Sequence, residues 1–97
     1  MTFYTRRQIV ELLDVEEGFV RALEQEEIIE SDGPEPSKLE FSERMLERVR
    51  VAHTLVDDLE VNLAGVVIIV RMREEIGELR QALESALQRI RSRSPSS

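Results

Sequence analysis

The chain has 97 residues, of which 41% are hydrophobic, 34% are charged and only 4% are aromatic. This length fits one domain with a modest, mainly aliphatic core. Because the chain contains no cysteine, disulfide bonds, thiolate metal sites and cysteine nucleophiles are excluded. The abundance of Glu, Arg, Leu and Gln favours a mainly helical protein.

The net charge of −7 is distributed unevenly along the chain. Residues 1–41 carry four basic and eleven acidic side chains, a net charge of −7. Residues 42–70 carry three and five, a net of −2, and residues 71–97 carry six and four, a net of +2. Proteins that bind nucleic acids usually cluster Lys and Arg to neutralise phosphates. The charge pattern therefore argues against DNA as a partner.

Two short helices are expected at the start of the chain. Thr5 and Gln8 have the spacing of a capping box, which marks the beginning of a helix. Apolar residues at helical spacing follow them, and a turn comes at residues 14–15. Asp14 can cap the second helix, which we expect over residues 16–27.

A small β-wing and a third helix are expected next. Residues 30–38 contain one Gly and two Pro among polar residues, which indicates a loop. The segments on either side, Ile28–Ile29 and Leu39–Phe41, are short and apolar, and they predict two strands of a wing. The third helix opens at residues 42–43 and ends before a turn near residues 59–61.

The last predicted helix is long and carries a heptad pattern. Asn62 is a good N-cap for a helix over residues 63–91, whose apolar residues step by 3 and 4. About 29 residues of helix span roughly 43 Å, more than a small head can cover. We therefore predict a homodimer, parallel or antiparallel, with the interface residues Ile69, Met72, Ile76, Leu79, Leu83, Ala86 and Ile90.

The predicted organisation is thus a head at residues 1–61, a dimerisation helix at residues 62–91 and a disordered tail at residues 92–97. Two short helices, a Gly/Pro wing and a third helix follow the order of a winged helix. The predicted fold class is therefore mainly α, a winged helix-turn-helix head with a small β-wing and a long C-terminal helix.

Four segments, taken in order, resemble the MerR superfamily. Its opening is similar to Tyr4-Thr5-x-x-Gln8-Ile9 followed by Leu12-x-x-Val15-x-x-x-x-Val20. Residues 26–29 (EEII) stand where that family ends its second helix with E-x-G-L-L. Residues 38–49 (KLEFSERMLERV) resemble its Y-R-x-Y-s-e-e-d-l-e-r-l segment. Residues 59–66 (LEVNLAGV) match the L-x-V-N-L-x-G-V step of the CbpM-like chaperone modulators, the closer resemblance.

The resemblance implies a MerR-like head, dimerisation through the long helices, and binding to the J-domain of a DnaJ-type, CbpA-like co-chaperone. It also implies inhibition, because occupying that face of the J-domain denies it to its Hsp70 partner. The alternative is a MerR-type transcriptional regulator that grips DNA. A third interpretation is a subunit or scaffold without a regulatory role.

The sequence departs from the DNA-binding members of this superfamily. Those members usually place Arg and Tyr in the second helix and follow it with a basic wing. Here the second helix is rich in Glu, and the wing carries Glu30, Asp32 and Glu35 against Lys38. A phosphate backbone would meet net negative charge on both elements, so DNA binding is not expected.

The acidic second helix is the candidate surface for a protein partner. J-domains, as a family, carry a basic helix next to their functional loop, and an acidic surface can steer such a partner. An ordinary solvated face is the competing interpretation of the same charge run. The candidate partner-binding residues are Glu16, Glu17, Arg21, Glu24 and Glu27.

Enzymatic and membrane roles find no support in the sequence. There is no Gly-rich phosphate loop and no Ser-His-Asp set, so we expect neither catalysis nor a cofactor. The single histidine, His53, predicts a packed, hydrogen-bonded residue rather than a metal ligand. No signal-peptide run follows the N-terminus, and the apolar stretch at residues 63–70 is too short to span a bilayer. We expect a cytoplasmic protein.

Overall fold

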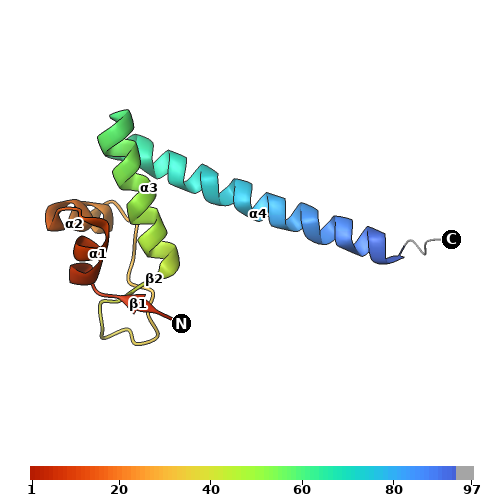
Figure 1. Cartoon of the computed structure of the whole chain (residues 1–97), viewed down its shortest axis with the longest axis horizontal. Coiled ribbons are helices and arrows are strands. Elements are labelled where there is room, and N and C mark those ends of the chain that lie inside the picture. The colour runs from red at the N-terminus through yellow and green to blue at the C-terminus, as the bar shows by residue number, and fades with distance from the viewer. Residues whose placement is uncertain (94–97) are drawn as a thin grey trace.

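The computed structural model describes residues 1–93, which form four helices and a two-stranded sheet. The elements follow in the order β1 (Phe3–Tyr4), α1 (Arg6–Leu13), α2 (Glu17–Gln25), β2 (Phe41–Ser42), α3 (Glu43–Leu59) and α4 (Leu63–Arg93). Figure 1 shows α1, α2, α3 and the sheet gathered into a head, from which α4 projects as a straight rod. The mainly helical fold class with a small sheet and a long last helix is confirmed.

The first helix begins as its sequence predicts. The Thr5 hydroxyl accepts a hydrogen bond from the Gln8 amide, and the Gln8 side chain accepts one from the Thr5 amide, at 3.2 and 2.9 Å. The prediction that Asp14 caps α2 is wrong, because Asp14 adopts a left-handed conformation (φ 52°) that closes α1. Glu16 occupies the N-cap position of α2 instead, without a side-chain cap.

The sheet pairs different segments from those predicted. β1 and β2 run antiparallel, with Phe3 opposite Ser42 and Tyr4 opposite Phe41. The prediction of a strand at Ile28–Ile29 is wrong, because both of these amides donate to the Leu23 carbonyl and close α2. Their side chains are buried in the core, which explains the apolar pair without a strand.

The wing loop is tied back onto β2 by side-chain hydrogen bonds. Asp32 accepts from the Ser42 amide and from the Ser42 hydroxyl, at 2.7 and 2.5 Å. The Ser31 hydroxyl accepts from the Glu40 amide at 3.1 Å. The loop over residues 30–38 therefore has no strand of its own, and polar contacts fix its course across the head.

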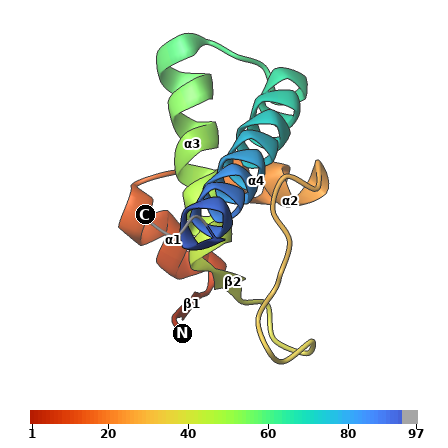
Figure 2. The same cartoon turned by 90° about the vertical axis from the view of Figure 1, so that its right-hand side faces the viewer.

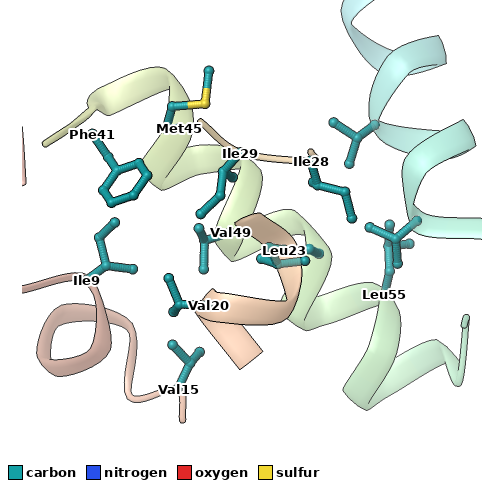
Figure 3. Packing of buried hydrophobic residues seen from close by; sticks show 13 residues of the cluster. Ile9, Val15, Val20, Leu23, Ile28, Ile29, Phe41, Met45, Val49 and Leu55 are labelled. Atoms are coloured by element: carbon teal, nitrogen blue, oxygen red, sulfur yellow. The ribbon is translucent and has the colours of Figure 1, made fainter. Parts of the chain in front are cut away.

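The core of the head draws on all three of its helices and on β2. Figure 3 shows Ile9 from α1, Val20 and Leu23 from α2, and Phe41 and Val49 converging on one another. The long helix adds only two residues to this core. Its full membership is Ile9, Val15, Val20, Leu23, Ile28, Ile29, Phe41, Met45, Val49, Ala52, Leu55, Val66 and Val70.

The long helix α4 starts at a cap and soon leaves the head. Asn62 accepts from the Gly65 amide through its side chain at 2.8 Å, as predicted. Beyond Glu74, every described residue of α4 is exposed except Ala86, which is half-buried. Figure 2 turns the molecule so that α4 runs toward the viewer, in front of the head. Residues 92–93, predicted as the start of a disordered tail, are helical, and residues 94–97 lie outside the described part.

Candidate functional site

The five residues predicted to bind a partner lie on or beside α2, but they are not equivalent. Glu24 is half-buried, and the Arg6 guanidinium donates to both of its oxygens at 2.8 and 3.0 Å. These bonds hold α1 against α2 and raise the pKa of Arg6. Glu24 therefore links α1 to α2 rather than offering a free carboxylate to a partner. Glu17 and Arg21 are exposed and pair with each other at 3.0 Å, one turn apart.

Glu16 and Glu27 are the predicted residues that remain accessible. Both side chains are exposed, and neither forms an ion pair with any residue among 1–93. Glu26 and Glu30, which flank the end of α2, share these properties and were not among the predicted site residues. Four exposed carboxylates without a cation therefore border α2, one at its N-cap and three after its last residue.

Glu27 also has an unfavourable backbone conformation. Its φ angle is 57°, in the left-handed region, at the position before the apolar pair where the family motif has Gly. A carboxylate at a helix C-terminus is further disfavoured by the helix dipole. Asp14 and Glu60 close α1 and α3 in the same way. The head therefore carries acidic residues where glycine would be better for stability.

The basic residues of the helix-turn-helix and the wing are largely neutralised within the head. Arg6 is bound by Glu24, Arg21 by Glu17, and Lys38 by Glu35 at 3.5 Å. Sustained phosphate contacts need cations that are free to leave their present partners. Of these three pairs only Arg6–Glu24 is shielded from solvent, and the other two are exposed.

The predicted dimer residues form an exposed apolar stripe on α4. Met72, Ile76, Leu79, Leu83 and Ile90 are between 48 and 69% exposed, and Ile69 and Ala86 are half-buried. Heptad reasoning missed Ile68 and Leu87, which are also exposed and widen the stripe. We call these nine residues the α4 stripe.

Most of the α4 stripe faces away from the head, and only Ile69 packs against the edge of the core. Ile68 and Met72 follow Val66 and Val70 by two residues each, and two residues turn a helix by about 200°. Val66 and Val70 are buried against the head, whereas Ile68 and Met72 are exposed on the opposite side. The head therefore does not obstruct the stripe.

A charged network fixes the direction in which α4 leaves the head. The Arg48 guanidinium donates to both oxygens of Glu74, at 2.7 and 2.6 Å, and to the Ile28 carbonyl at 2.8 Å. Arg44 donates to the same carboxylate at 3.0 Å. Burial raises the pKa of Glu74, but the hydrogen bonds from Arg48 and Arg44 outweigh it and leave the pKa lowered. Sequence reasoning missed this network, since its partners lie 20 to 30 residues apart.

His53 on α3 is half-exposed, with 35% of its side chain accessible, so it is less packed than the core histidine that its place on the apolar side of the helix predicted. Its ring meets the ring of Phe19 edge-on, with centroids 5.6 Å apart, and its Nε2 lies 3.1 Å from Asp57. Within residues 1–93, no three side chains are arranged to hold a metal ion. No helix in that range combines the length and the apolarity needed to cross a membrane.

Comparison with known proteins places this fold in a family. Residues 4–88 match the profile described as MerR HTH family regulatory protein, and the chain belongs to this family. Within that class, it is similar to chaperone modulatory proteins CbpM from strains of Coxiella burnetii, with 31% identity over 58 residues. The match covers 60% of this chain and 55% of each relative, so it spans about half of their length. No solved structure matches.

Proposed function

We propose that this chain is a non-enzymatic chaperone modulator of the bacterial cytoplasm, which binds the J-domain of a DnaJ-type, CbpA-like co-chaperone and inhibits it. The similarity to proteins named chaperone modulatory supports the general role. The observation that carries the proposal is the set of exposed, uncompensated carboxylates at the two ends of α2. No cofactor takes part.

The binding mechanism is electrostatic complementarity. Glu16, Glu26, Glu27 and Glu30 present negative charge without an internal cation, so a basic helix of the partner replaces water rather than an existing salt bridge. Long-range attraction raises the association rate, and salt weakens it. Once bound, the chain occupies the J-domain face that its Hsp70 partner needs, and inhibition is competitive.

We further propose that two copies pair along the α4 stripe. Its residues are apolar and continuous over about three heptads, and from Met72 onward all but Ala86 are exposed. A dimer would present two acidic surfaces, and an antiparallel pair would hold the two heads far apart. Because the chain has no natural cysteine, Ile90→Cys, at the C-terminal end of the stripe itself, tests the orientation directly. A disulfide forms readily between parallel copies and not between antiparallel ones.

The decisive experiment is calorimetric titration of the dimer with a J-domain from the co-chaperone of the same bacterium. Glu16→Lys combined with Glu27→Lys should weaken binding by about 10- to 100-fold, and the loss should shrink in high salt. Glu78→Lys is the matched control, because this exposed acid lies on the projecting part of α4. Unchanged affinity in the double variant would remove α2 as the binding surface.

Membership of the MerR HTH family favours a second candidate function, DNA-binding transcriptional regulation. A gel-shift assay with duplex DNA at low salt distinguishes the two. The chaperone proposal expects no retained complex, because acidic side chains outnumber basic ones by eleven to four over residues 1–41. A protein–DNA complex that dissociates as the salt concentration rises would favour the transcriptional regulator.

A further inference from the structure

A small apolar hollow lies between α3 and α4, on the opposite side of α4 from the stripe. Figure 1 shows the two helices diverging from their connecting turn as a V, and the hollow lies inside it. It encloses about 230 Å³, less than a drug-sized ligand needs and suited to one side chain. Its lining residues are Arg44, Glu47, Arg48, Val51, Val70, Arg73 and Glu74.

The charge of this hollow is opposite to that of the chain. Its lining holds three arginines against two glutamates, in a chain whose net charge is −7. Arg44 and Arg73 are 62 and 58% exposed at its mouth. The Arg73–Glu47 contact is long, at 3.6 Å, and Arg44 bonds to Glu74 at 3.0 Å. Because both arginines are exposed, each can exchange its partner at little cost. The hollow therefore suits an apolar side chain that has a carboxylate beside it.

Gly77 leaves the backbone of α4 open next to the hollow. It follows Val70 by seven residues and so lies on the same side of the helix. A side chain at Gly77 would meet nothing within 4 Å, so packing within one copy does not explain it. Glycine in the middle of a helix costs about 1 kcal/mol relative to alanine, and here it allows another segment to approach α4 closely.

The complementary shape and charge are present on the same molecule, at the tip of the V. Leu59 ends α3 and is 65% exposed, which is unusual for a leucine at a turn between two packed helices. It stands between Asp58 and Glu60, both exposed. We call residues 57–60 the apex. The apex is an apolar side chain flanked by carboxylates, the chemistry that the hollow selects.

We propose that the apex of a second copy docks into the hollow. Leu59 covers Val51 and Val70, and the flanking carboxylates meet Arg44 and Arg73. The two surfaces are different, so the contact is heterologous and links one copy to the next. It is separate from the α4 stripe and does not depend on the proposed function. Because it is much smaller than a standard interface, we expect a dissociation constant between about 10 µM and 1 mM.

Sedimentation velocity of the full chain over that concentration range tests the docking. At low concentration the sedimentation coefficient is that of the monomer or of the stripe dimer. As concentration rises, the weight-average coefficient should increase above that value. Leu59→Ser should abolish the rise, because the apolar group is lost from an exposed position without harm to the fold. Circular dichroism confirms that the variant is folded, and Leu12→Ser, at another exposed leucine of the head, is the matched control.

A mixing experiment makes the test specific for the two surfaces. One variant reverses the apex (Asp58→Lys with Glu60→Lys) and the other reverses the rim (Arg44→Glu with Arg73→Glu). Each alone should lose the association, by about tenfold or more. Their mixture should regain it, because each reversed surface then meets an opposite charge. A wild-type coefficient that is constant with concentration, or a mixture that stays dissociated, would overturn the proposal.

Discussion

The head and the projecting part of α4 contain similar aliphatic residues but treat them in opposite ways. Ile9, Val20 and Phe41 are completely buried within the head, whereas Leu79 and Leu83 on α4 are more than half exposed. The head buries its hydrophobic side chains within one copy, and the projecting part of α4 leaves its own exposed. An apolar stripe that a single copy leaves in water has to be explained by a partner. The head therefore folds around its own core, whereas the α4 stripe is the surface for which association is proposed.

The largest effect is expected from a cavity in the head. Phe41 is fully buried in β2, so Phe41→Ala should lower the free energy of unfolding by about 3–5 kcal/mol. Urea denaturation followed by circular dichroism measures this change. Leu39→Ala, two residues earlier and exposed, is the control and should cost little. Similar losses in both variants would mean that the core is not the one described.

The second-largest effect is expected on dimerisation, when charged residues are placed in the α4 stripe. Leu79→Asp combined with Leu83→Asp should weaken dimerisation by about a hundredfold or more, because two carboxylates would be desolvated between helices. Sedimentation equilibrium should then show a monomer near 11.2 kDa, while the head remains folded. Gln81→Asp with Gln88→Asp changes the opposite side of α4 and should leave the dimer intact. A wild-type monomer at micromolar concentration would refute the stripe as an interface.

The junction of the two regions should respond to pH. The pKa of Glu74 is lowered in the folded state, so its carboxylate contributes stability that is fully present above the unfolded pKa. That contribution is lost as the pH falls through the lower, folded-state pKa. Glu74→Gln should cost about 1–2 kcal/mol at neutral pH, and the difference from wild type should disappear in acid. A difference that is independent of pH would contradict the arginine network.

The smallest effect is expected at the left-handed acids. Glu27→Gly should stabilise the head by about 0.5–1 kcal/mol, because glycine adopts this conformation without strain. The same variant should bind the J-domain more weakly, since it removes one of the uncompensated carboxylates. Glu60→Gly is the matched control, with a similar gain in melting temperature and unchanged J-domain binding. Equal binding by both variants would show that Glu27 serves no partner.

The candidate site was only partly predictable. Sequence reasoning found the acidic character of α2, because charge can be counted without coordinates. It could not distinguish Glu24, which Arg6 holds from a different helix, from Glu27, which nothing holds. It also placed Ile28–Ile29 in a strand, since a short apolar pair looks the same whether it extends a sheet or closes a helix over the core.

Local interactions are what the amino-acid sequence determined by itself. The Thr5–Gln8 capping box, the Asn62 cap and the periodic apolar face of α4 involve residues no more than a few positions apart, so their spacing reveals them. Tertiary structure alone decided the pairing of Phe3–Tyr4 with β2, the Arg6–Glu24 link and the grip of Arg48 on Ile28 and Glu74. These contacts join residues 18 to 39 positions apart, and chain folding must bring such partners together before either can select the other.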